Sequence, residues 1–250
     1  MNNNIILSIK NLSKSYYTLN GEIKAIDNIS FDVKEGSYLS IVGSSGCGKS
    51  TLLNILAGLD KATEGNICFN KKLKIGYMLQ EDALLPWLTV KENALLGLRV
   101  TGNDTKDNIN YVENLLKTYG LEAFMNKKPH ELSGGMKQRV ALIRTLATKP
   151  DLLLLDEPFS ALDYQSRLKV SDDVYQIIKA EKKTAIMITH DIAEAISISD
   201  EVLVLSKRPA TIKKHYDIVL TNKSTPINNR KALEFSQYYD AIWRDLDVSI

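Results

Sequence analysis

One stretch near the start of the chain limits the possible folds more than any other, because it demands a fixed order of local structure. It consists of Gly43, Ser44, Ser45, Gly46, Cys47, Gly48, Lys49, Ser50 and Thr51, and it fits the pattern G-x-x-x-x-G-K-S/T. An apolar run of strand type at 38–42 precedes it, and apolar residues at helical density follow it at 52–59. A strand, a glycine-rich loop and a helix N-terminus in this order predict a phosphate-binding loop. In it, Lys49 reaches the terminal phosphates and Ser50 ligates Mg²⁺.

A second informative stretch is the run of four leucines at 152–155, which ends in Asp156 and Glu157. A continuous apolar run is typical of a central parallel strand, and functional residues gather at the C-terminal ends of such strands. We therefore expect Asp156 to hold Mg²⁺ through water and Glu157 to polarise an attacking water. A solvated turn would explain an isolated pair of acidic residues. In a chain that also has a phosphate loop, a pair at a strand end is better explained as part of the same nucleotide site.

His190 follows a predicted strand at 184–189 and so lies at the same kind of strand end as Glu157. A lone histidine is more often structural than catalytic. The shared location favours a residue that senses the γ-phosphate and orients water as a neutral imidazole. His130 and His215 have no such location, and we expect them to be structural.

Ser133, Gly134 and Gly135 open a helix that is expected to run to about Lys149. Ser133 is a natural N-cap, so a capped helix is one sufficient interpretation. The other is a second anion site at a helix N-terminus. Because a single small nucleotide has little need of two such sites from one chain, this motif hints at a symmetric dimer. In such a dimer, each copy caps the nucleotide of the other.

Composition excludes some classes of function. The 250 residues carry 32 basic and 30 acidic side chains, a net charge of +2, so nothing indicates binding of nucleic acid through bulk charge. A disulfide between Cys47 and Cys68 would distort the phosphate loop, so we expect a reducing compartment. The N-terminus has no leader pattern, and no run approaches the ~18 apolar residues that span a bilayer. We expect a soluble chain whose membrane role needs a partner.

The rest of the pattern alternates strands and helices, with one interruption. Strands are predicted at 5–9, 25–33, 66–70, 74–79, 201–205 and 211–219, and helices at 90–100, 104–119 and 164–181. Asn20 and Gly21 mark a turn, and the strands at 66–70 and 74–79 are expected to form a hairpin that ends at Gln80. The two helices after Gln80 indicate a helical subdomain. A polar loop at 221–230 and an amphipathic helix that packs on the domain end the chain.

Five motifs stand in one order along the chain: the phosphate loop, Gln80, Leu132-Ser133-Gly134-Gly135, the strand ending in Asp156-Glu157, and His190. Together they resemble the nucleotide-binding subunit of ATP-binding cassette (ABC) transporters. The resemblance implies an α/β fold, with a P-loop NTPase core around a parallel sheet, an N-terminal antiparallel β subdomain and a helical subdomain at about 81–150. It also implies an ABC ATPase domain at 1–222. The segment 223–250 would be a C-terminal loop and helix that pack on it.

The same resemblance implies ATP and Mg²⁺ as cofactors and assigns roles to residues around them. Tyr16 would stack on adenine, with Tyr17 as the neighbouring competitor, and residues 43–51 would form the phosphate cradle. Gln80 would link Mg²⁺ and the attacking water to the contact with a permease.

Other implied roles concern hydrolysis and the dimer. Ser133 and Gly135 would contact the γ-phosphate bound by the opposite chain, and Asp163 resembles an aspartate at the dimer contact. Glu157 would be the general base or water-positioning residue, and His190 the switch.

The segment that follows Gln80 narrows the subfamily. Leu84-Leu85-Pro86-Trp87 is similar to the corresponding sequence in ATPases of nitrate, sulfonate, taurine and bicarbonate importers. There are two departures: the hairpin before Gln80 looks short, and Arg144-Thr145-Leu146 replaces the more usual Arg-Ala-Leu. Neither departure touches the hydrolytic residues.

The resemblance thus implies a peripheral ATPase at the cytoplasmic face of the membrane. It would dimerise on ATP and drive permease subunits that receive a solute from an extracytoplasmic binding protein. The alternatives are an exporter ATPase, a soluble clamp acting on nucleic acid or ribosomes, and a small-molecule kinase. A clamp usually has two cassettes or a coiled-coil insertion, which this sequence lacks, and a kinase would leave the Leu-Ser-Gly-Gly motif without a purpose.

Overall fold

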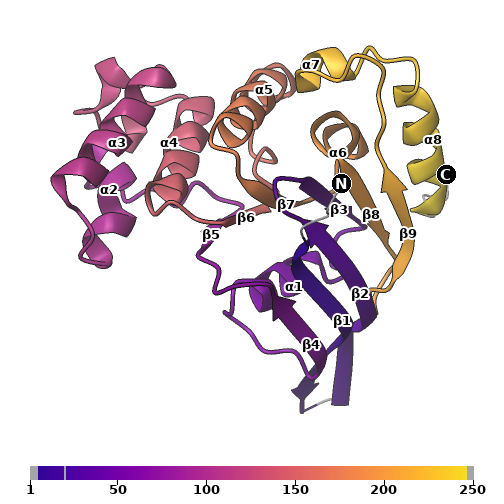
Figure 1. Ribbon diagram of the computed structural model, residues 1–250. Coiled ribbons are helices and arrows are strands. Elements are labelled where there is room, and N and C mark those ends of the chain that lie inside the picture. The colour runs from indigo at the N-terminus through magenta and orange to yellow at the C-terminus, as the bar shows by residue number, and fades with distance from the viewer. Residues whose placement is uncertain (1–4, 20, 247–250) are drawn as a thin grey trace.

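The computed structural model describes residues 5–19 and 21–246, which form two β-sheets with helices around them (Figure 1). Three sequence-based expectations fall partly or wholly outside these residues. They are the missing leader at the chain start, Asn20 of the predicted turn, and the last four residues of the predicted C-terminal segment.

A six-stranded sheet forms the centre, in the order β5-β6-β7-β3-β8-β9. Its strands are β3 (Tyr38–Val42), β5 (Ile75–Met78), β6 (Leu152–Asp156), β7 (Thr184–Thr189), β8 (Glu201–Leu205) and β9 (Ile212–Asp217). All neighbours are parallel except β8 and β9. The four inner strands are buried along their whole length, which explains why they read as continuous apolar runs.

The smaller sheet is antiparallel, in the order β2-β1-β4, and lies at the bottom of Figure 1. Its strands are β1 (Ile5–Thr18), β2 (Gly21–Lys34) and β4 (Glu64–Phe69). The predicted hairpin at 66–79 is wrong, because β4 pairs with β1 while β5 joins the other sheet beside β6. Tyr16 and Tyr17 also lie on β1, which extends nine residues beyond the strand predicted at 5–9.

Three helices form a lobe at the left of Figure 1: α2 (Val90–Val100), α3 (Lys106–Thr118) and α4 (Gly134–Ala147). Two short 3-10 turns, η1 (Glu122–Phe124) and η2 (Pro129–Glu131), connect α3 to α4. A capping box fixes the start of α2, since the Thr89 hydroxyl accepts from the Glu92 backbone N–H and Glu92 accepts from that of Thr89. Apolar residues of this lobe share one core with α5 (Tyr164–Ala180).

The helix that follows the phosphate loop, α1 (Lys49–Leu56), packs between the two sheets, and its leucines belong to a core that both sheets share. α6 (Ile192–Ile198) contacts both α7 (Pro226–Asn229) and α8 (Phe235–Asp245), and α7 lies beside α5 (Figure 1). Neither α6 nor α7 was expected from the sequence. Ile242 of α8 is fully buried against Ile196 and Ile218, so the last helix packs on the sheet region.

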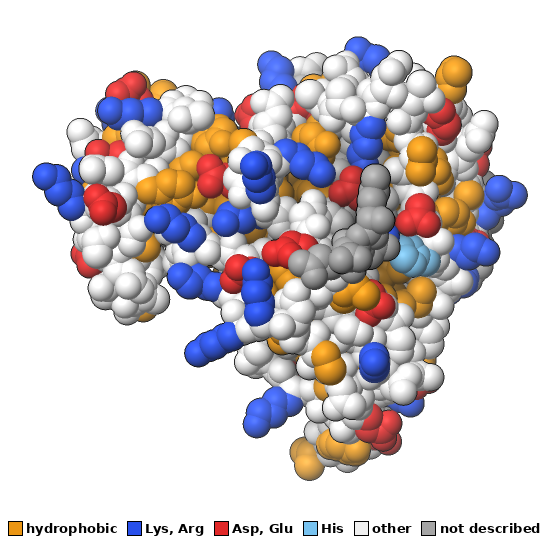
Figure 2. Space-filling view, viewed as in Figure 1, with side chains coloured by type: hydrophobic (Ala, Val, Ile, Leu, Met, Phe, Trp, Pro, Cys, Tyr) orange, Lys and Arg blue, Asp and Glu red, His pale blue; other side chains and the backbone are white. Residues whose placement is uncertain are grey.

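The fold class expected from the motifs is confirmed: a parallel central sheet, an antiparallel β subdomain and a set of helices. The domain limits at 222 and at 81–150 remain predictions. None of the helices in the described part of the chain is both long and apolar enough to cross a bilayer. On the face seen in Figure 2, acidic and basic side chains are interspersed, in keeping with the small net charge.

Candidate functional site: a nucleotide pocket at the sheet edge

An open pocket of about 660 Å³ lies where β3, β6 and β7 reach their C-terminal ends. Residues from seven separate parts of the chain line it: Tyr16, Ile23, Ala25, Ser45, Gly46, Gly48, Lys49, Ser50, Thr51, Gln80, Glu157, His190 and Arg208. Ten of these thirteen were singled out from the sequence. This location is the one at which parallel α/β sheets bind ligands.

The phosphate loop approaches β2 closely at Gly48. This residue has φ +127°, and a side-chain carbon there would lie only 2.8 Å from the carbonyl oxygen of Ala25 on β2. Gly48 is also the N-cap of α1 and offers no side chain to the first backbone N–H groups of the helix. Because those amides have no side-chain acceptor, the start of α1 is suited to a phosphate.

Lys49 is buried within its own loop. Its ammonium group donates to the carbonyl oxygens of Gly43 at 2.8 Å and Ser44 at 3.1 Å. Gly43 is buried beneath the Cys47 side chain, and Ser44 and Cys47 line a shallow hollow beside the pocket. The lysine side chain therefore lies across the loop, with its ammonium group held by two carbonyl oxygens of the loop.

Asp156 ends β6 and is only 7% exposed. Burial raises the pKa of its carboxyl group above the usual value, and the nearby Tyr77 and Ser50 hydroxyls oppose that rise. Tyr77 donates to Oδ2 at 3.2 Å, while Oδ1 is buried without a hydrogen-bond partner among the described residues. A free carboxylate oxygen next to the Ser50 hydroxyl fits the oxygen ligands that Mg²⁺ prefers.

Glu157 and His190 meet at the mouth of the pocket. His190 Nδ1 lies 2.9 Å from Glu157 Oε2, and the glutamate side chain is 17% exposed. Glu157 has φ +42°, a backbone conformation that costs a non-glycine residue roughly 1–2 kcal/mol. Its backbone N–H donates to Ile188 on β7 at 3.0 Å and holds the turn in place. Backbone strain of this kind is common at functional sites.

The remaining motif, Ser133-Gly134-Gly135, lies outside the pocket at the start of α4. The Ser133 hydroxyl accepts from the backbone N–H of Met136 at 3.3 Å. A side-chain carbon at Gly134 would meet Leu162 Cδ2 at 2.9 Å, and one at Gly135 would meet Val170 Cγ2 at 2.6 Å. Within one chain, these glycines allow the start of α4 to pack closely on α5 and on the residues just before it.

Asp163 has a comparable local role, as the N-cap of α5. Its carboxylate accepts from the backbone N–H groups of Gln165 and Ser166 at 3.1 Å each. These contacts lower the pKa of Asp163, with the hydrogen bonds from Ser166 as the largest cause.

The two candidate tyrosines differ clearly in position. Tyr16 lines the pocket and donates to Asp60 Oδ2 at 2.9 Å, and the Lys14 ammonium lies 4.7 Å from the centre of its ring. Tyr17 is 75% exposed and does not line the pocket. Of the two, only Tyr16 therefore belongs to the pocket.

Sequence reasoning missed Arg208, which lines the pocket and donates from two guanidinium nitrogens to Gly46 O at 3.0 and 3.3 Å. It thereby braces the outer turn of the phosphate loop. The available signal was its position just after β8, since a basic pair at the C-terminal end of a parallel strand shares the location of the other site residues.

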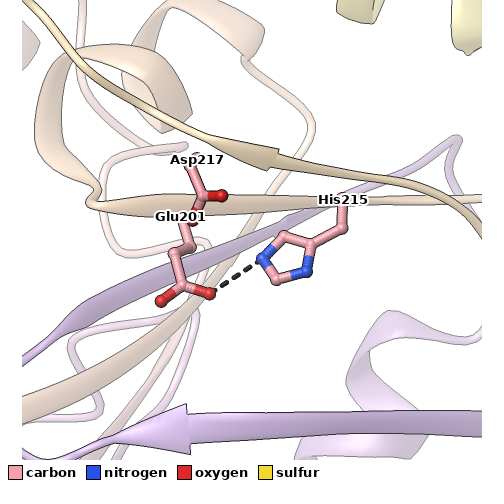
Figure 3. A group of neighbouring side chains, drawn as sticks. All are labelled: Glu201, His215 and Asp217. Atoms are coloured by element: carbon pink, nitrogen blue, oxygen red, sulfur yellow. Dashed lines mark hydrogen bonds and ion pairs between the residues drawn. The ribbon is translucent and has the colours of Figure 1, made fainter. Parts of the chain in front are cut away.

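A second cluster of polar side chains lies on the β8–β9 ladder: Glu201, His215 and Asp217 (Figure 3). His215 Nε2 lies 2.8 Å from one carboxylate oxygen of Glu201, and Lys34 donates to the other at 2.7 Å. Because both oxygens of Glu201 already have partners, this cluster is explained as an ion-paired strand ladder, and we assign no metal to it.

The fold and the pocket together define a nucleotide-hydrolysing protein of the phosphate-loop class. Comparison with known families makes this specific: residues 26–160 match the ABC transporter family, and the chain belongs to that family. It is an ABC-type ATPase, the ATP-binding subunit of a transporter.

Two relatives and one solved structure illustrate the match. The taurine import ATP-binding protein TauB of Ruegeria pomeroyi is 42% identical over 84% of this chain and 81% of its own length. The nitrate transport protein NasD of Klebsiella oxytoca is 38% identical over 94% and 92%. The ATP-binding cassette MJ0796, solved as a dimer in a post-hydrolysis state with ADP and Pi, is 33% identical. It aligns with a TM-score of 0.73 over 86% of this chain and 99% of its own.

Proposed function

We propose that this chain is the ATPase subunit of an importer that takes up a small solute of the nitrate, sulfonate or taurine kind. Two of the relatives described above are named for taurine import and nitrate transport. The Leu-Leu-Pro-Trp segment after Gln80 supports the same group of importers. An exporter ATPase is the alternative, and it differs in needing no extracytoplasmic binding protein.

The mechanism rests on one observation: the motif residues lie in two separate places on the chain's surface. Lys49, Glu157 and His190 line one pocket, whereas Ser133 and Gly135 lie at a separate helix N-terminus. Two copies arranged head to tail would bring the second set over the nucleotide held by the first. The dimeric state of the related cassette with ADP and Pi is consistent with this arrangement.

In this scheme, each side chain acts on a defined part of the nucleotide. Tyr16 stacks on the base, and the loop amides with Lys49 hold the phosphates. The Glu157 carboxylate orients a water and accepts its proton, and His190 keeps that carboxylate in position through their hydrogen bond.

Ser50, Gln80 and Asp156 would hold Mg²⁺, which when bound neutralises charge on the phosphate oxygens. When the second copy closes, its Ser133 and Gly135 add hydrogen-bond donors to the terminal phosphate. Loss of that phosphate after hydrolysis removes this contact and lets the two copies separate.

The contact with the membrane partner is assigned to the loop between Gln80 and α2. Trp87 in this loop is 66% exposed, as expected of an aromatic residue that anchors another protein. In this proposal the ATPase lies peripherally at the cytoplasmic face, bound to paired permease subunits.

The test is a tagged purification of the chain from membranes of its host, followed by identification of the co-purified proteins by mass. We expect a multi-span permease and a solute-binding protein. Trp87→Ala should lose the permease but keep ATPase activity, whereas Leu233→Ala, which removes another exposed apolar side chain, should keep both. Recovery of a permease without a binding protein would favour the exporter, and recovery of neither would contradict a transport role.

A further inference from the structure

Tyr77 lies on β5, three residues before Gln80, and turns toward the phosphate-loop helix. Successive residues of a strand face opposite sides of the sheet. Met78 accordingly packs in the core shared with the helical lobe, whereas Tyr77 packs against the core that contains α1. Its ring is thus directed to the face of the sheet on which α1 lies.

The phenol hydroxyl meets two acceptors there. It lies 3.2 Å from Asp156 Oδ2 at the end of β6 and 3.0 Å from Asn54 Oδ1 on α1. A hydroxyl has one proton and donates to one oxygen at a time, and a charged carboxylate is the stronger acceptor. Tyr77 therefore connects the strand that leads to Gln80 with both the Asp156 carboxylate and α1.

This contact distinguishes the two oxygens of the carboxylate. Oδ2 has a donor, whereas Oδ1 is buried without one among the described residues. Without the tyrosine hydroxyl, Oδ2 would lose this donor, and this contact would no longer fix the orientation of the carboxylate.

We propose that Tyr77 is a positioning residue for the Mg²⁺-binding carboxylate: its hydroxyl fixes Oδ2 of Asp156 and reserves Oδ1 for the ion or its bound water. The inference rests on the function proposed above, because it needs Asp156 to act on Mg²⁺. Groups that hydrogen-bond to metal ligands orient those ligands, and their loss typically weakens metal binding by 10–100-fold.

The test compares Tyr77→Phe with Tyr111→Phe. Tyr111 also donates to a carboxylate, Glu181 Oε2 at 2.7 Å, but lies on α3 and does not line the pocket. Mn²⁺ binding to the complex with a non-hydrolysable ATP analogue is measured by electron paramagnetic resonance. We expect about 10-fold weaker Mn²⁺ affinity for Y77F and no change for Y111F. Nucleotide affinity in EDTA should be unchanged in both, and excess Mg²⁺ should restore the ATPase rate of Y77F.

Equal Mn²⁺ affinities for Y77F and the wild-type protein would overturn the inference. Asn54→Ala supplies a second test that keeps the tyrosine and leaves its proton to Asp156 alone, so its Mn²⁺ affinity should not fall. A 10-fold loss in N54A would mean that the hydroxyl serves α1 instead of the carboxylate. A wild-type protein that binds no Mn²⁺ with nucleotide would instead contradict the function proposed for the pocket.

Discussion

Two helices of this molecule, α1 and α4, begin at glycine-containing loops and yet treat their first backbone amides differently. At α1, the N-cap is Gly48, which provides no side-chain acceptor. At α4, the hydroxyl of Ser133 accepts from Met136 and satisfies one of these amides. Neither helix has an acidic residue in its first turn. A helix that leaves its amides open is prepared for an anionic ligand, whereas a capped helix can exist without one.

The surroundings of the two helix starts differ in the same sense. The start of α1 faces a pocket that also contains Lys49 and Glu157, with Asp156 buried behind it. The start of α4 lies outside that pocket, and its glycines pack on Leu162 and Val170. The start of α1 therefore has the charged groups of a binding site. The start of α4 has none of them and is suited to cover a nucleotide that another chain binds.

The largest expected effect tests the chemistry on the α1 side. Glu157→Gln removes the carboxylate that would accept the proton of water, so the ATPase rate should fall by about 10³-fold while ATP still binds. Light scattering should then show an ATP-dependent dimer that persists. If only monomers are found with ATP, the closure of α4 over a second chain's nucleotide is wrong.

The next effect concerns a buried acid on α6. Glu194 on α6 is 3% exposed, and burial raises its pKa to about 7, with Asp191 adding to the rise and Thr189, Arg167 and Arg230 opposing it. A carboxyl group with a raised folded-state pKa stabilises the fold fully below its unfolded pKa, near 4.5, and loses that contribution as the pH rises through about 7. The total loss is about 3 kcal/mol.

Urea unfolding of Glu194→Gln measures this loss, because glutamine does not titrate. Between pH 5 and 8, the stability of the wild-type protein should decline more than that of E194Q. Parallel pH dependences of the two proteins would show that this acid is not buried as described.

A smaller effect tests the lysine of the α1 loop. Lys49→Ala removes a charge-assisted donor worth about 2 kcal/mol, so ATP affinity should weaken by about 30-fold in a fluorescence titration. Lys223 is a matched control, because its ammonium also donates to a backbone carbonyl, Ser199 O at 2.6 Å, and does not line the pocket. Lys223→Ala should keep ATP affinity, and an unchanged affinity in K49A would remove the proposed role of the lysine.

The smallest effect concerns the cap of α4. Ser133→Ala should cost about 1 kcal/mol of stability, as should Thr105→Ala, which removes the corresponding cap of α3. Both variants should bind ATP as monomers, but only S133A should weaken the ATP-dependent dimer. If the two variants dimerise equally with ATP, Ser133 acts only as a helix cap and has no role in the dimer.

The parts of the fold that were predicted correctly are those whose signals are local. β3, β7, β8 and α2 lie within the predicted bounds, since the strands are largely apolar runs and the helical pattern of α2 lies within its own eleven residues. The phosphate loop was recognised for the same reason, because its function depends on consecutive backbone groups.

The errors arise where pairing is decided by distant residues. β4 and β5 are close in sequence, but Ile67 pairs with Ile9 and Tyr77 pairs with Leu154, so the strands enter different sheets. α6 was missed because seven residues give too little periodicity to detect.

The same limit applies to the site. Arg208 reaches the phosphate loop because β8 lies beside β3, and Tyr77 reaches Asp156 because β5 lies beside β6. Neither residue belongs to a motif with a fixed spacing, so only the sheet order brings Arg208 to the loop and Tyr77 to Asp156.

The contact between Gly48 and the carbonyl of Ala25 has a consequence for how the molecule assembles. Because Ile23 and Ala25 of β2 line the nucleotide pocket beside the loop, that pocket is complete only once the antiparallel sheet has docked on α1. The ability to hold a nucleotide should therefore emerge late in folding, after the two sheets have joined, and ligand binding would report on completed assembly rather than on the loop alone.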